Sequence, residues 1–172
     1  MILSGSEIKK QVILGRIHIY PFMEGHINPN SYNYRLSDEL LEIVDDPIDP
    51  KSKVQYKKTI MSTQGYVLQP GRLYLGSTVE EIGSEYYVTS LIGRSSVGRL
   101  GLFLQITADL GQLGAKHRWT LELTVVQPLV IYPMMQIGQV SFWNVEGQAE
   151  SLYNGKYAKY SVAHCSEIYQ EF

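Results

Sequence analysis

Residues 93–102 read G-R-S-S-V-G-R-L-G-L and stand between two stretches with strand character, 86–92 and 102–107. Two arginines bracket two serines, and the small residues between them let backbone N–H groups approach a ligand. Arginine donates paired hydrogen bonds to phosphate, and a serine at the head of a short helix caps it and leaves an anion-binding end. The segment predicts an anion-binding turn; composition alone leaves open an ordinary polar turn with solvated arginines.

Short stretches with period-two alternation surround this turn on both sides. They are separated by turn signals such as Gln69-Pro70-Gly71 and Gln127-Pro128. Many short strands at this spacing favour a mainly β protein, namely a sandwich, a jelly roll or a distorted barrel. Besides the two stretches above, the expected strands are 17–20, 32–36, 54–59, 72–77, 119–126, 129–132 and 137–143.

One short helix is expected at the N-terminus. Ser4 and Glu7 have the spacing of a capping box, and Gly15 is a plausible helix stop. Ile8, Val12 and Ile13 are predicted to share its buried face. Residues 45–53, which are rich in Asp and Pro, are expected to form a surface loop.

Length and composition describe an ordinary globular chain. It has 172 residues, 44% hydrophobic and 19% charged, which predicts one domain over 1–172 with residues 153–172 as an arm or lid. The formal net charge of −2 argues against a nucleic-acid partner. The lone Cys165 excludes an internal disulfide and a Cys-rich zinc site. With no membrane-length apolar run and no visible signal peptide, we expect a soluble cytoplasmic protein.

Glu122 is a candidate general base. In the expected strand 119–126, Trp119, Leu121 and Leu123 point one way, whereas Glu122 points the other way with the threonines. If the polar face lines a pocket, Glu122 is placed to take a proton; otherwise it is a solvated carboxylate. None of the four histidines stands in an H-x-E or H-E-x-x-H pattern, so zinc-dependent deaminase chemistry is not expected.

Several segments together resemble the dCTP deaminase branch of the dUTPase superfamily. Residues 93–102 match its G-R-S-S-x-x-R-L-G-L motif, which is the most specific feature, and residues 120–123 match the strand that bears its catalytic glutamate. Further similar segments are 2–5 with Ile8, I-N-P-N-S-Y-N-Y-R-L at 27–36, I-G-Q-V-S-F at 137–142 and Y-N-G-K-Y at 153–157.

The resemblance implies a dUTPase-like distorted β-barrel or jelly roll that forms a homotrimer with active sites between subunits. It implies that Glu122 activates water without zinc, that Ser95 and Arg99 orient water and base, and that dCTP, bound with Mg²⁺, becomes dUTP and ammonia in pyrimidine deoxynucleotide biosynthesis. It also implies dTTP as a feedback inhibitor. The further substrate-binding positions it implies are Arg94, Ser96, Ala108, Gln112, Thr120, Gln139, Tyr153, Lys156 and Tyr160.

The chain departs from the family pattern in ways that leave alternatives open. Gln112 replaces an aspartate that normally contacts the sugar, and Tyr160 stands where a glutamine is usual. One alternative is a bifunctional enzyme that converts dCTP to dUMP, for which Asp109 lies three residues from the altered position. A second is a trimeric nucleotide-binding module without turnover, against which the retained Glu122 and Arg99 argue. A dedicated dUTPase is disfavoured, because its arm is usually Gly-rich and residues 153–172 contain one glycine.

Overall fold

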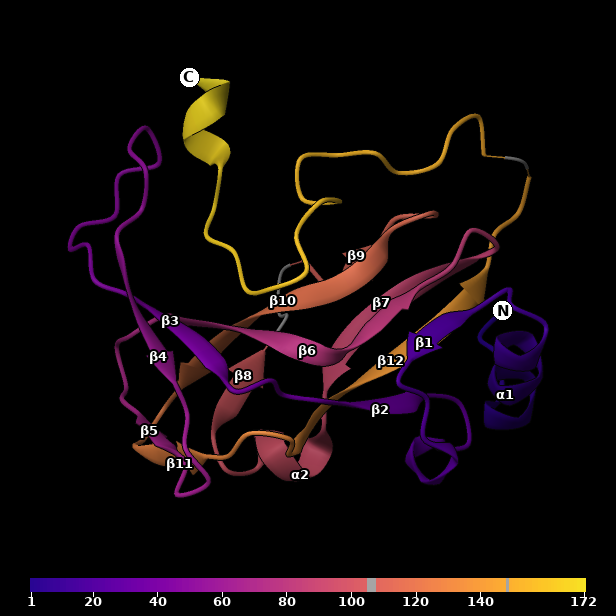
Figure 1. Cartoon of the computed structure of the whole chain (residues 1–172), viewed down its shortest axis with the longest axis horizontal. Helices are drawn as coiled ribbons and strands as arrows, with labels where there is room; N and C mark the ends of the chain where they lie inside the picture. The colour runs from indigo at the N-terminus through magenta and orange to yellow at the C-terminus, as the bar shows by residue number, and fades with distance from the viewer. Residues whose placement is uncertain (105–107, 148) are drawn as a thin grey trace.

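The computed structural model describes residues 1–104, 108–147 and 149–172, and β-strands dominate them (Figure 1). Within these residues the strands form three antiparallel sheets. The largest has the order β4-β3-β6-β10-β8, with β1 also paired to β6; the others are β2-β12-β7-β9 and β11-β5. The prediction of a mainly β protein is confirmed, whereas the barrel closure and the homotrimer stay predictions.

Most elements follow one another along the chain after short connections; the longer ones join β3 to β4 and β12 to η2. Their bounds are α1 Gly5–Ile13, β1 His18–Tyr20, η1 Glu24–His26, β2 Tyr32–Arg35, β3 Glu39–Ile43, β4 Tyr56–Ile60, β5 Tyr66–Leu68, β6 Tyr74–Gly83, β7 Tyr87–Gly93, α2 Ser95–Gly98, β8 Leu102–Leu104, β9 Leu110–Gly111, β10 Lys116–Val125, β11 Leu129–Ile131, β12 Gln136–Asn144 and η2 Ile168–Glu171.

Most expected strands are present with shifted ends. The strand expected at 102–107 is described as Leu102–Leu104, and its remainder lies outside the described residues. Residues 45–53 contain no helix or strand, as expected for a loop. Three strands were not predicted: β3, β5 and β9. β5 and β9 are only two or three residues long, too short for a periodic signal.

β3 was missed because it is buried on both faces. Leu40 belongs to the main hydrophobic core, whereas the adjacent Leu41 packs with Ile43 and Leu75 in a second cluster. A strand covered on both sides carries consecutive apolar residues, so the alternation that marks a half-exposed strand is absent. β3 thus separates the main core from the smaller cluster on which the C-terminal segment lies.

The N-terminal helix begins and ends where the sequence predicts. The Ser4 side chain accepts a hydrogen bond from the Glu7 N–H at 3.3 Å, and Gly15 follows the helix with a φ of 71°. The prediction that Ile13 shares the buried face is wrong, because its side chain is 74% exposed. A five-residue step from Ile8 rotates about 140° around the axis, which carries Ile13 to solvent.

Two hydrophobic clusters hold the sheets together. The main core joins residues of all three sheets, including Tyr34, Leu68, Leu121 and Phe142, each of which is fully buried. Among the described residues, no helix has both the length and the apolar character that a bilayer crossing requires.

Candidate active site

Strand β10 positions Glu122 beside a cavity. Leu121 and Leu123 are fully buried in the main core, so Glu122 between them faces the other side of the sheet, opposite Leu75 of β6. The predicted alternation of this strand is confirmed over residues 121–125.

At Trp119 the predicted alternation of β10 is interrupted by a bulge. The pairing of β10 with β6 shifts register between Arg118 and Thr120. An extra residue in one strand turns neighbouring side chains onto a common face. Trp119 was expected on the face of Leu121 and Leu123, away from Glu122. It does pack against the main core, but it also lines the cavity together with Thr120 and Glu122.

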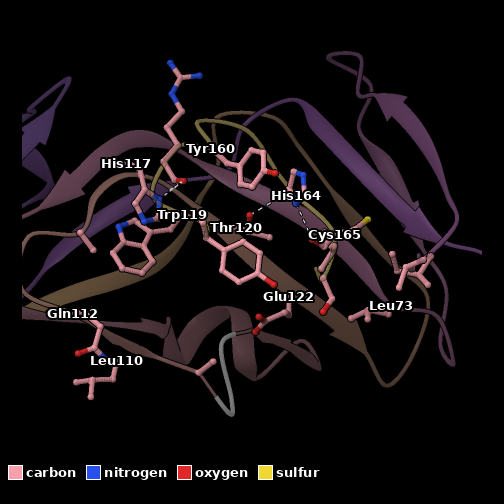
Figure 2. Close-up of a pocket in the computed structure, with 18 of the residues that line it drawn as sticks. Leu73, Leu110, Gln112, His117, Trp119, Thr120, Glu122, Tyr160, His164 and Cys165 are labelled. Carbon is pink, nitrogen blue, oxygen red and sulfur yellow. Dashed lines mark hydrogen bonds between the residues drawn. The ribbon is translucent and has the colours of Figure 1, made fainter. Parts of the chain in front are cut away.

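The cavity has a volume of about 450 Å³, which suits a small-molecule ligand (Figure 2). One part of its wall is aliphatic and comes from β3, β6 and the 44–55 loop. Another part is aromatic and comes from β10 and the C-terminal segment. The residues that line it are Ile43, Ile48, Val54, Leu73, Leu75, Ala108, Leu110, Gln112, Ala115, His117, Arg118, Trp119, Thr120, Glu122, Tyr153, Tyr157, Tyr160, His164, Cys165 and Ser166.

Among the described residues that line the cavity, Glu122 carries the one carboxylate. Burial raises the pKa of its side chain above the ordinary value for glutamate, because the charged form loses hydration. A carboxylate of raised pKa in an apolar cavity is a stronger base than a solvated one, and planar aromatic walls suit a nucleobase. The arrangement can therefore activate a water molecule beside a bound ring.

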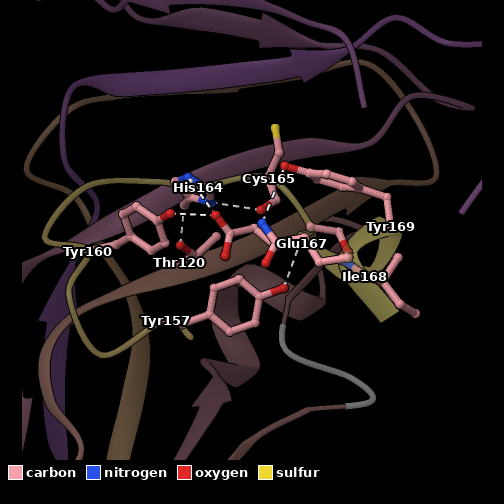
Figure 3. A network of polar contacts seen from close by, with 10 residues as sticks. Thr120, Tyr157, Tyr160, His164, Cys165, Glu167, Ile168 and Tyr169 are labelled. Carbon is pink, nitrogen blue, oxygen red and sulfur yellow. Dashed lines mark hydrogen bonds and ion pairs between the residues drawn. The ribbon is translucent and has the colours of Figure 1, made fainter. Parts of the chain in front are cut away.

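The C-terminal segment closes one side of the cavity (Figures 2 and 3). The His164 backbone N–H donates to Thr120 Oγ1 at 3.2 Å, which ties the segment to the strand that carries Glu122. The His164 ring stacks on Tyr160 with ring centroids 3.6 Å apart. The Glu167 N–H donates to the Tyr157 hydroxyl at 3.0 Å. Both tyrosines and His164 line the cavity.

Two further contacts fix where this segment lies. The Tyr153 N–H donates to the Leu113 carbonyl at 2.7 Å, next to the turn before β10. Ala163 and Cys165 pack into the second hydrophobic cluster against Leu41. The segment is thus held at both its start and its middle, as a wall of the cavity.

The structure divides the predicted site residues into two groups. Half of the predicted positions line the cavity and come from β10, from the stretch before it and from the C-terminal segment. These are Ala108, Gln112, Thr120, Glu122, Tyr153 and Tyr160.

The second group lies elsewhere in the chain. Arg94, Ser95, Ser96 and Arg99 belong to α2 and its ends, which lie far from the C-terminal segment in Figure 1. Gln139 of β12 is their neighbour, because Gly138 pairs with Gly93 in the sheet. Ser95, Ser96 and Arg99 are exposed, and none of this group lines the cavity.

The expected serine cap of α2 is wrong. Arg94 occupies the N-cap position in extended conformation, and Ser95 is the first helical residue. The Arg94 Nη1 donates to the Gln136 carbonyl at 3.0 Å, which fixes the turn against the start of β12. An arginine cannot accept the N–H bonds that a serine cap would take.

Lys156 and Asp109 also lie outside the cavity wall. Lys156 pairs with Glu171 of the C-terminal segment. The Asp109 carboxylate accepts a hydrogen bond from the Ser90 hydroxyl at 2.9 Å. Asp109, which the sequence offered near the altered position 112, is therefore engaged with β7 in this structure.

The sequence analysis missed several residues of the wall, among them His117, Arg118, Tyr157 and His164. The stacking of His164 on Tyr160 depends on a segment without periodicity, so no pattern marked it. Arg118 lines the cavity, and its buried Nε has no hydrogen-bond partner among the residues that the structure describes. Within the described residues, no group of three or more His, Cys, Asp or Glu side chains is placed to hold a metal ion; the absence of zinc stays a prediction.

Comparison with known proteins places this geometry in a family. A family model described as dCTP deaminase-like matches residues 2–145. The chain belongs to the dCTP deaminase-like family. The resemblance inferred from residues 93–102 and 120–123 is thereby confirmed.

Its relatives cover the chain from end to end. A protein of Hathewaya histolytica named "dCTP deaminase, dUMP-forming" is 45% identical over 172 residues, covering 100% of this chain and 99% of the relative. Proteins of the same name from Clostridium botulinum (strain Alaska E43 / Type E3) and Cytophaga hutchinsonii are 44% and 42% identical, with 100% of this chain and 99% of each relative covered. The prediction of an enzyme of the dCTP deaminase kind is confirmed.

A solved structure supports the fold. The 2'-deoxycytidine 5'-triphosphate deaminase of Agrobacterium tumefaciens matches with a TM-score of 0.65 at 19% identity. The match covers 82% of this chain and 47% of that chain, so this chain spans about half the length of that protein.

The comparison corrects the expected product. We expected dUTP as the product of dCTP deamination. The relatives that match the full chain are named for forming dUMP, so the first expectation is wrong and the bifunctional alternative agrees better.

Proposed function

We propose that the protein hydrolyses dCTP to dUMP, ammonia and diphosphate. The observation that carries the proposal is the position of Glu122. This half-buried carboxylate of raised pKa lies in a cavity that has aromatic walls and the volume for a nucleoside. The names of the full-length relatives supply the substrate and the product.

Deamination is assigned to Glu122. Its carboxylate takes a proton from water, and the hydroxide adds to the ring carbon that bears the amino group of cytosine. The proton returns to the amino nitrogen, the carbon–nitrogen bond breaks, and ammonia leaves a uracil ring. General bases of this kind contribute about 10²–10⁴-fold in rate.

Release of diphosphate uses a second water, which attacks the α-phosphorus and breaks the bond to the β-phosphate. Arg94, Arg99, Ser95 and Ser96 offer the charge-assisted donors that such a phosphate chain needs. We propose that the nucleotide brings its magnesium ion, which neutralises phosphate charge during this step.

A homotrimer joins the two groups of site residues. The exposed α2 residues lie beside exposed apolar side chains, namely Leu100, Phe103 and Val126, which are 52%, 42% and 65% exposed. Apolar side chains gathered beside exposed donors favour contact with a second copy. In the proposed trimer, α2 of one subunit faces the Glu122 cavity of the next and completes the active site.

One assay tests the proposal. The protein is incubated with dCTP, dUTP, dCMP and CTP in the presence of magnesium, and ammonia, dUTP, dUMP and diphosphate are resolved. We expect ammonia, dUMP and diphosphate in equal amounts from dCTP. Accumulation of dUTP without dUMP would contradict the proposal, as would release of no ammonia. EDTA and added dTTP in the same assay test the magnesium requirement and the feedback inhibition.

A further inference from the structure

The C-terminal segment pairs two predicted nucleotide-binding side chains with its own carboxylates. Lys156 forms an ion pair with Glu171, and the Tyr160 hydroxyl donates a hydrogen bond to the Glu167 carboxylate. These contacts are independent, since they use different donors and different acidic residues. Each acceptor is an anionic oxygen of the kind that a phosphate presents.

The surroundings of Glu167 are those of an anion-binding site (Figure 3). The residue is 8% exposed, although it is charged. His164 Nε2 lies 3.9 Å from its carboxylate, and Lys159 Nζ lies 5.0 Å from the centroid of the Tyr160 ring. The Tyr160 hydroxyl, as the main cause, holds the pKa of Glu167 below its ordinary value. The cluster therefore favours a negative charge.

Glu171 is the last residue of η2, Ile168–Glu171, which Glu167 precedes. Its pair with Lys156 is more exposed, with side chains 60% and 33% accessible, so salt and competing anions reach it. A bound anion can displace this contact more readily than the buried one. The two carboxylates thus form an inner and an outer contact with the same stretch of chain, residues 156–160.

We propose that Glu167 and Glu171 act as an internal substitute for nucleotide phosphate, which holds the C-terminal segment in a resting state and competes with the triphosphate for Lys156 and Tyr160. This inference rests on the proposed function, because it assigns those two donors to the nucleotide. It predicts that binding of nucleotide frees residues 167–172 while the donors turn to phosphate.

The test compares dCTP affinity in a background that binds without turnover. Calorimetry is performed on Glu122→Gln and on the same protein carrying Glu167→Gln and Glu171→Gln. Glutamine retains the acceptor oxygen and the shape, so the fold is kept while the charge is lost. We expect the Kd for dCTP to fall about threefold to tenfold, the range of one or two partly exposed charge pairs.

Glu85→Gln in the same background is the matched control. Glu85 is exposed and precedes β7. The Glu85→Gln substitution removes one negative charge that takes no part in the contacts of Glu167 with Tyr160 or of Glu171 with Lys156. This control measures how much the affinity for the anionic dCTP rises merely because the protein carries one negative charge fewer. A triple variant that binds dCTP no more tightly than this control, or more weakly, overturns the proposal.

Hydrogen–deuterium exchange gives a second readout, which would not change if the contacts of Glu167 and Glu171 only stabilised the fold of the C-terminal segment. We expect exchange in residues 167–172 to become faster when dCTP is added to Glu122→Gln. Slower or unchanged exchange in that segment would overturn the proposal. Glu167 and Glu171 would then only hold the C-terminal segment against the cavity, without competing with the triphosphate. Failure of Glu122→Gln to bind dCTP at all would instead contradict the proposed function.

Discussion

At the scale of single residues, the proposed chemistry depends on Glu122. Glu122→Gln keeps the size of the side chain but cannot take a proton from water. We expect ammonia release from dCTP to fall about 10²–10⁴-fold, while nucleotide binding and the folded structure are preserved. Stopped-time ammonia assays measure the loss, with Glu85→Gln as a control that should keep full activity. A variant that binds dCTP and deaminates it near the normal rate would leave Glu122 as an ordinary strand carboxylate.

The raised pKa of Glu122 predicts how activity depends on pH. Because the base must be ionised, kcat/KM falls as the pH drops through this pKa. Burial favours the protonated form, so the acidic limb should lie at higher pH than for an exposed glutamate. A profile of kcat/KM against pH measures the limb, and a limb at the ordinary glutamate value would contradict the environment described for the cavity.

The raised pKa of Glu122 also predicts how the stability of the fold changes with pH. A folded-state pKa above the unfolded value stabilises the fold below the unfolded pKa, and this contribution is lost as pH rises through the folded pKa. Glu122→Gln removes the buried charge, so it should gain melting temperature relative to the unmodified chain at neutral pH and lose that advantage in acid.

Glu122, Trp119 and Asp109 show which side-chain positions could be predicted from the sequence and which could not. Alternation identified Glu122, because a half-buried strand leaves a period of two in the sequence. It placed Trp119 against the core correctly but not beside the cavity, since the bulge depends on pairing with β6, which lies distant in sequence. Nothing in the neighbouring sequence argued against Asp109 as a substitute for the aspartate missing at position 112. The hydrogen bond from Ser90 shows where the Asp109 carboxylate lies.

At the scale of elements, the α2 turn carries the donors assigned to phosphate. Arg94 is its N-cap and also bonds the Gln136 carbonyl. Arg94→Ala should weaken triphosphate binding about tenfold or more, since charge-assisted bonds contribute roughly 1.5–3 kcal/mol each. Titration with dCTP and dCMP measures this, and the loss should be larger for the triphosphate.

Two controls separate binding from folding in that experiment. Arg94→Lys keeps the charge but loses the paired donors, so it should recover affinity only in part. Arg16→Ala removes an exposed arginine that lies over the Tyr86 ring, and should leave affinity unchanged. An unchanged KM and kcat in Arg94→Ala would reject the phosphate role of this turn.

The elements that could be predicted were those with a local signal. The N-terminal helix has a cap and a glycine stop, and the long strands β7, β10 and β12 alternate or carry apolar runs. β3 and the C-terminal segment depend on contacts between distant parts of the chain, Leu41 with Ala163 and Thr120 with His164. Such contacts leave no period in the sequence. The resemblance supplied Tyr153 and Tyr160 of the cavity wall, but the contacts that hold the wall in place were not foreseen.

At the scale of the whole molecule, the separation of the two residue groups makes a prediction about assembly. The cavity with Glu122 and the α2 turn with Arg99 are distinct surfaces of one chain, and a trimer would bring them together between subunits. Glu122→Gln and Arg99→Ala should therefore each be inactive alone yet complement one another. When the two variants are unfolded, mixed equally and refolded, about one site in four should contain both intact groups.

The mixture should accordingly recover about a quarter of the original ammonia release, measured per subunit against each variant refolded alone. Sedimentation of the same samples should show a trimer, which checks that the variants still assemble. Recovery requires that Glu122 of one chain and Arg99 of another act on the same nucleotide. A mixed trimer with no more activity than its parents would place both groups in one chain, and the division of site residues seen here would then require a movement of α2 toward the cavity.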